Sequence, residues 1–206
     1  MSIRRFITVR YLQWVVWVSV SLYWCFIIIQ SAATDVFDWH LAITETGNVA
    51  WIMLVFTIYI SLLQKLFRPY WLFNNLLPLR KHTGILSFLV ACSHALLQML
   101  RMGIIADAPA MLKAAFSLQY SMVFGTVSIL IMVPLFITST NRAMARMGYS
   151  TWKMLQRFAH LAFIVAAIHI SFIGYFGGRG VEPEPLILLA VYAGGYAYLF
   201  VQRRQG

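Results

Sequence analysis

The chain has 206 residues, of which 61% are hydrophobic and only 11% are charged. Soluble domains carry roughly 25% charged residues, and here the charges fall between long uncharged runs, which is typical of a multi-pass membrane protein. The formal net charge of +10 makes nucleic acid a candidate partner. We exclude nucleic acid, because the basic residues flank apolar segments instead of forming a run.

Six apolar spans follow one another along the chain, each near the ~20 residues that a helix needs to cross ~30 Å of hydrocarbon. Backbone groups in lipid must be hydrogen-bonded internally, so these spans are expected to be helices. Barrel strands would be about 10 residues long with alternating polarity, and no such alternation is seen. The expected spans are Tyr11–Gln30, Val49–Gln64, Thr83–Leu100, Tyr120–Ile137, Phe158–Phe176 and Leu186–Val201.

Charge predicts the orientation of these spans. With six spans, both termini and the second and fourth loops share one side, and all but three of the 16 basic residues fall there. The opposite side holds Arg101, Lys113 and Arg179 together with all six acidic residues. Because loops rich in lysine and arginine stay inside, both termini are expected in the cytoplasm.

The loop between the fourth and fifth spans has residues that begin and end helices. Thr140 or Asn141 can cap a short basic helix that Gly148 ends, and Ser150 or Thr151 can cap the fifth span. The short helix is expected to lie at the membrane surface with its arginines toward anionic headgroups.

His40 is expected in an outer loop. The other four histidines lie on the third and fifth spans, which are expected to run parallel from the cytoplasmic face. His94 is 14 residues past Arg80 and His169 is 16 past Lys153, so the two imidazoles are expected at similar depth. Haem b is often held by two neutral imidazoles, and we predict that His94 and His169 are its axial ligands. The alternative is hydrogen bonding between helices, worth about 0.6 kcal/mol on average.

The other two histidines of these spans give weaker evidence for a haem site. His160 faces away from His169, and His82 lies about 120° around its helix from His94, given ~100° per residue. A second haem held by His82 and His160 would be tilted or shifted. In the alternative, His82 lies at headgroup level and His160 packs between helices. Arg101, two turns beyond His94, is a candidate partner for a haem propionate or a snorkelling surface arginine.

Two segments resemble a known family. "LRKHTGILSFLVACSHALL", residues 79–97, resembles the pattern of the ferric-reductase-like transmembrane superfamily. "FITSTNRAMARMGYSTWKMLQRFAHLAFIVAAIHI", residues 136–170, is similar to the pattern of its MsrQ (YedZ) branch, and "TGNVAW" before the second span fits as well. The resemblance covers about residues 46–172.

The resemblance implies a haem b membrane subunit that takes electrons from the quinol pool or from a cytoplasmic flavin reductase. It implies a bacterial inner membrane, a periplasmic acceptor such as the methionine sulfoxide reductase MsrP, and room for FMN. By motif, His94 and His169 match the family's outer haem pair. Four residues after Trp152 the family usually has histidine, where this chain has Gln156. Glutamine is a poor haem ligand, so a second haem would need His160 instead.

We therefore expect one all-α domain over residues 1–206, a six-helix membrane bundle that carries haem. No Walker-type loop and no strand–GxGxxG–helix unit is present, so an electron donor would have to be another molecule. Acidic outer residues such as Asp35, Asp38 and Glu184 are candidates for docking a basic partner. The alternatives are a non-redox membrane scaffold, in which the span histidines only pack, and a stand-alone ferric or metal reductase.

Overall fold

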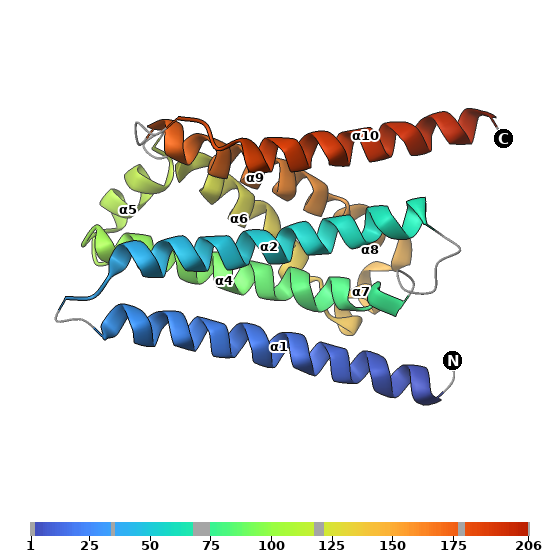
Figure 1. Cartoon of the computed structure of the whole chain (residues 1–206), viewed down its shortest axis with the longest axis horizontal. Helices are drawn as coiled ribbons and strands as arrows, with labels where there is room; N and C mark the ends of the chain where they lie inside the picture. Colours follow the sequence, from blue (N-terminus) through green and yellow to red (C-terminus); the bar gives the residue numbers. More distant parts are fainter. Residues whose placement is uncertain (1–2, 34–35, 68–74, 118–121, 177–179, 206) are drawn as a thin grey trace. The chain divides into compact units, whose positions relative to one another are not determined.

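The computed structural model describes residues 3–33, 36–67, 75–117, 122–176 and 180–205, with the side chains of 3–9, 176, 203 and 205 left aside. All regular structure in these ranges is helical (Figure 1), which confirms the all-α prediction. The helices are α1 (Ile3–Ala32), α2 (Trp39–Leu66), α4 (Leu79–Arg101), α5 (Ala108–Ala115), α6 (Met122–Ile137), α7 (Asn141–Met147), α8 (Tyr149–Gln156), α9 (Phe158–Phe176) and α10 (Pro183–Gln205).

Five stretches of the described chain are long and apolar enough to cross a membrane, so the protein is a polytopic membrane protein. They are Arg10–Ala32, Trp39–Leu66, Leu79–Arg101, Tyr149–Tyr175 and Pro183–Gln202. The predicted fourth span corresponds to α6, which has 16 residues. A sixth crossing is counted only when α6 is joined to α7 across a bend of 85°. The expected start of that span, Tyr120, lies outside the described residues.

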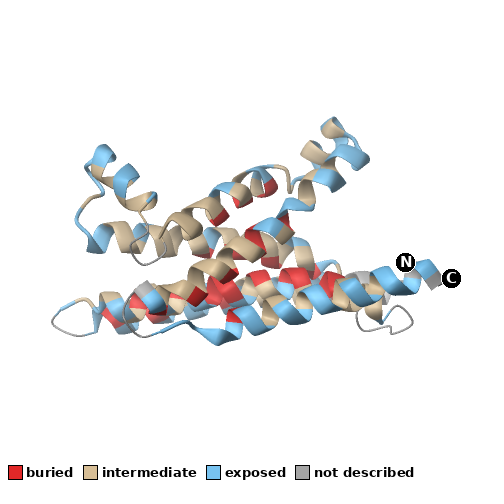
Figure 2. Ribbon diagram, turned by 90° about the horizontal axis from the view of Figure 1, so that it is seen from above, coloured by how far each residue is buried: buried red, intermediate tan, exposed pale blue. Residues whose placement is uncertain are grey.

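The helices divide into two compact units, and α2 contributes to both. The first unit comprises Met1–Thr57 and Asn75–Met111, and the second comprises Ile58–Asn74 and Leu112–Gly206. Buried residues in Figure 2 follow the contact faces of the helices, while the remaining faces are exposed and apolar, as expected for surfaces that meet lipid. Each unit is described by itself below.

In the first unit, α4 packs against α1 and α2, and hydroxyl side chains bond it to α2. The Ser87 hydroxyl of α4 donates to the Ala50 carbonyl of α2 at 2.8 Å. Further along, the hydroxyls of Thr57 and Thr83 lie 2.8 Å apart. These pairs show that α2 and α4 run antiparallel, because residue numbers rise along one helix as they fall along the other.

In the second unit, α9 is antiparallel to α6 and α10. The Ser128 hydroxyl of α6 donates to the Ala162 carbonyl of α9 at 3.0 Å. The next residue of α9, Phe163, is fully buried. The end of α2 instead runs parallel to α10. The Tyr59 hydroxyl bonds the Leu188 carbonyl, and later in both helices Lys65 bonds Tyr196.

The parallel course of α2 and α10 bears on the number of crossings. Consecutive crossings of a membrane alternate in direction. If α6 were not a crossing, three reversals would separate α2 from α10 and the two helices would run in opposite directions. Counting α6 as the fourth crossing gives four reversals, which agrees with the contacts between α2 and α10. Helix direction therefore supports six crossings.

Two local predictions were wrong. Val49 was the predicted start of the second span, but α2 begins at Trp39, and His40 lies on this helix instead of in a loop. Asp38 explains the earlier start, because its carboxylate accepts from the Leu41 amide at 3.0 Å and caps the helix. The fifth span was expected to be capped by Ser150 or Thr151, but both residues lie inside α8.

The short basic helix α7 was predicted correctly. Thr140 caps its start by accepting from the Ala143 amide at 3.1 Å. Gly148 follows its last residue with φ of +78°, a backbone conformation that favours glycine.

Candidate functional site

His94 is held by a backbone carbonyl of the neighbouring helix. Its ring lies on α4, half-buried, with Nδ1 2.8 Å from the carbonyl oxygen of Ile43 on α2. A carbonyl can only accept, so Nδ1 carries the proton and donates. The neutral ring then has its lone pair on Nε2, which is the tautomer that binds iron in haem proteins.

Gly47 of α2 lies directly against the same imidazole. A methyl group built on Gly47 would be 3.1 Å from both Cε1 and Nδ1 of His94. Carbon atoms pack best at about 3.5–4.0 Å, so the ring occupies space that any side chain at position 47 would need. Gly47 is one helical turn beyond Ile43, and this places the carbonyl and the glycine under one ring.

His169 has a similar setting in the second unit. Its ring, on α9, faces Gly125 of α6. A methyl group at Gly125 would lie 3.0 Å from Cε1 and 3.2 Å from each of the two ring nitrogens. Because both nitrogens are nearly as close as Cε1, the glycine faces the flat side of the ring.

The two predicted axial ligands belong to different units, so their pairing stays a prediction. Within its own unit, each one is an imidazole of an apolar helix with a glycine of a neighbouring helix at its ring. No group of three or more His, Cys, Asp or Glu side chains among the described residues could hold a bare metal ion. Haem iron is commonly held by single imidazole nitrogens, so each of these rings could supply one axial ligand.

His82 is bonded in a different way from His94. The indole Nε1 of Trp17 on α1 donates to Nδ1 of His82 at 3.0 Å. Because Nδ1 accepts, a neutral ring carries its proton on Nε2 and neither nitrogen keeps a lone pair for iron. This hydrogen bond favours the packing alternative for His82, and the second haem stays a prediction.

His160 lies among aromatic side chains of α10. Its Nδ1 is 2.9 Å from the Tyr192 hydroxyl, and the Tyr196 ring meets it edge-on with centroids 5.9 Å apart. Lys65 donates to the Tyr196 hydroxyl at 3.1 Å. A phenol can donate or accept, so either tautomer of His160 fits. These contacts give His160 a packing role between α9 and α10.

Gln156 occupies the position where the resemblance placed a ligand. Its amide lies 3.5 Å from the Thr138 hydroxyl, at the edge of hydrogen-bond distance. The indole of Trp152 donates to the Thr138 carbonyl at 2.9 Å. Trp152 and Gln156 therefore both meet the residue that follows α6.

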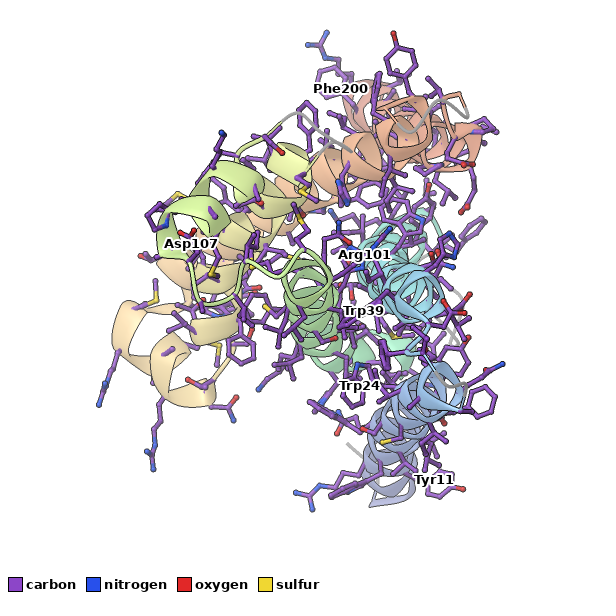
Figure 3. All side chains as sticks on the ribbon, turned by 90° about the vertical axis from the view of Figure 1, so that its left-hand side faces the viewer. Tyr11, Trp24, Trp39, Arg101, Asp107 and Phe200 are labelled. Carbon is purple, nitrogen blue, oxygen red and sulfur yellow. The ribbon has the colours of Figure 1, made fainter. Side chains whose placement is uncertain are left out.

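Arg101 is the last residue of α4 and is exposed. Figure 3 looks onto this end of the first unit, where Arg101 and Trp39, the first residue of α2, are both labelled. His94 is two turns earlier on α4, about 10 Å at 1.5 Å per residue. The contact between Arg101 and a propionate stays a prediction.

The small residues beside His94 pack against protein. Ser87 and Val90 are buried, and Ala91 packs on the same cluster, which includes Val20 of α1 and Ala50 of α2. These residues share a face of α4 with His94, where small side chains could leave room for the edge of a macrocycle or let helices approach closely. In the structure this face brings helices close together, which is the usual role of small residues in membrane helices.

The fold and these imidazoles define an all-helical, multi-pass membrane protein with nitrogen ligands inside its spans. A family model, described as the ferric reductase like transmembrane component, matches residues 46–168, more than half of the chain. The chain belongs to this family, and membership indicates a role in membrane electron transfer. Of the site residues, Gly47, His82, His94, Gly125 and His160 lie inside the matched range, and His169 follows its last residue. Comparison with curated proteins and with solved structures gives no match.

Sequence reasoning missed Ile43, Gly47 and Gly125. The first two fall before the predicted start of the second span, so they were placed in a loop. The available signal was the cost of glycine inside a helix, about 1 kcal/mol relative to alanine, which is usually accepted for a packing reason.

Proposed function

We propose that this protein is a haem b electron-transfer subunit of a bacterial inner membrane, with His94 and His169 as axial ligands. The observation that carries the proposal is the bond from His94 Nδ1 to the Ile43 carbonyl, inside a family of membrane electron carriers. This bond sets the ligating tautomer and orients the ring, as second-shell partners do at other metal sites. Haem b supplies a one-electron carrier that works within the apolar interior.

The residues of this chain would do the remaining work. The imidazoles hold the group between the two faces of the membrane, and the lipid-facing helices exclude water from it. The exposed Arg101 is proposed to meet a propionate. Electrons would come from quinol or a cytoplasmic flavin reductase and pass to a periplasmic acceptor such as an MsrP-like protein, as the resemblance implies.

Docking of that acceptor on acidic outer residues is also a proposal. Asp38 and Asp107 cap α2 and α5 through their Oδ1 atoms, so both have a structural role as well. They and Glu184 are exposed, while Asp35 lies outside the described residues. A basic partner would meet these carboxylates and gain association rate more than affinity.

The test is spectroscopic. Protein purified from haem-replete cells should show a dithionite-reduced α band of haem b, with one haem per chain. Reduction by a quinol analogue would then be compared with reduction by a flavin reductase and NADH. A colourless wild-type protein would contradict the cytochrome proposal and favour the alternative of a non-redox membrane scaffold.

A second candidate, a stand-alone ferric reductase, is favoured by the description of the matched family. Reconstituted protein that reduces a ferric chelate on the outer face, with no partner present, would support this candidate. A bound FMN, the other group that the resemblance allows, would be detected by flavin fluorescence after denaturation.

A further inference from the structure

We propose that Gly47 and Gly125 are positioning residues, each of which seats one haem-ligating imidazole and fixes the orientation of its ring. This inference deepens the proposed function and rests on it for its haem readouts. The Gly47–His94 and Gly125–His169 contacts each lie within one unit, so neither depends on how the units are arranged.

The support for a seat comes from the atoms that the two glycines meet. A methyl group at either glycine would come within 3.0 to 3.1 Å of its imidazole. By contrast, a methyl group on Gly84, which is on the same helix as His94, would be 3.4 Å from Thr57, an ordinary contact. Close approaches also occur at Gly174, against the Gly180 carbonyl, and at Gly195, against the Leu62 side chain. What sets Gly47 and Gly125 apart is that the atoms they meet belong to the rings of the predicted ligands.

The two seats act on different parts of the ring. At Gly47 a methyl group would press on the edge of His94 that includes Nδ1, the atom bonded to Ile43. Alanine there would push the donor away from its carbonyl. At Gly125 a methyl group would press on the face of His169 and turn the ring about its side-chain torsions.

These differences predict different signatures. A hydrogen bond from Nδ1–H makes an axial imidazole more basic and so stabilises the ferric form. Gly47→Ala should therefore shift the reduction potential in the positive direction and weaken haem affinity by roughly 10- to 100-fold, the usual cost of losing such a partner. Gly125→Ala should change the low-spin ferric electron paramagnetic resonance spectrum, which reports the angles of the axial imidazole planes.

The chain offers matched controls. Gly84→Ala makes the same change on α4 with an ordinary contact, and Gly194→Ala makes it on α10, where no described atom lies within 4 Å of the added methyl. Both controls should retain the wild-type potential and spectrum. Alanine is also the better helix former by about 1 kcal/mol, so Gly194→Ala should leave stability unchanged or raised.

A double-mutant cycle tests the contact without haem. Gly47→Ala should lower the thermal stability of the haem-free protein, and the loss should vanish when His94→Ala removes the ring, because contacting residues show coupling energy. The same holds for Gly125→Ala with His169→Ala. If Gly47→Ala fails to fold, recovery of folding in the His94→Ala background supports the seat, and no recovery overturns it.

The outcomes separate the two proposals. A wild-type protein that binds no haem overturns the proposed function, while the haem-free cycle still reports on the seats. If the wild type binds haem but Gly47→Ala and Gly125→Ala match Gly84→Ala and Gly194→Ala in potential, spectrum and coupling energy, the seats are overturned and the function stands.

Discussion

The histidines of α4 and α9 fall into two pairs with different neighbours. The later residue of each helix, His94 or His169, has its ring against a glycine of another helix. The earlier residue, His82 or His160, bonds an aromatic side chain, Trp17 or Tyr192. The indole N–H of Trp17 takes a lone pair of His82, whereas a glycine brings no side chain to the ring and lets the helices approach closely around it. The same residue type is therefore packed in two different ways, and we propose that the pair beside the glycines is the one that ligates haem.

The largest expected effect is on haem content, when the imidazole of His94 or His169 is removed. His94→Ala and His169→Ala should each abolish the haem absorbance, because an alanine side chain supplies no ligand atom. The pyridine haemochrome assay gives haem per chain. His40→Ala is the matched control, since His40 is an exposed histidine of α2. Full haem content in either variant would contradict the assignment of that histidine as an axial ligand.

Removing His160 should lower stability but not haem content. The ring loses its bond to Tyr192 and its edge contact with Tyr196, for which about 1–2 kcal/mol is expected. Thermal unfolding in detergent measures the loss, and Tyr192→Phe, which removes the hydroxyl alone, should show a smaller one. A drop in haem per chain in His160→Ala would instead support the second haem.

A smaller effect is expected from Trp17→Phe. The substitution keeps an aromatic ring and removes only the N–H that donates to His82. We expect a loss of about 0.6 kcal/mol, the average for hydrogen bonds between membrane helices, with unchanged haem. His82→Ala should likewise keep the full haem ratio. A ratio that rose in Trp17→Phe would show that the indole had been withholding His82 from iron.

The smallest effect is expected at Gln156. Its amide lies 3.5 Å from Thr138, so Gln156→Ala should change thermal stability by less than about 0.5 kcal/mol, as most partly exposed substitutions do. Trp152→Phe, which removes the 2.9 Å bond to the Thr138 carbonyl, is the comparison and should cost more. An equal or larger loss in Gln156→Ala would show that the glutamine, and not the tryptophan, holds this turn.

The sequence by itself determined the class of fold. A chain with 61% hydrophobic residues and charges gathered between apolar runs can satisfy its backbone in lipid only as helices. The cap at Thr140 and the glycine stop at Gly148 were also readable, because both depend on side chains next to the helix end. Local chemistry was sufficient for these features.

Only the tertiary structure decided what each histidine touches. Helix periodicity predicted on which side of its own helix each histidine lies. It did not predict which residue of a neighbouring helix the ring contacts. The Ile43 carbonyl that bonds His94 is a backbone group, so the residue type at position 43 does not predict this bond. Trp17 is 65 positions away from His82 in the sequence. The tautomer of an imidazole depends on such partners, so it follows from packing between helices and not from the order of residues along one of them.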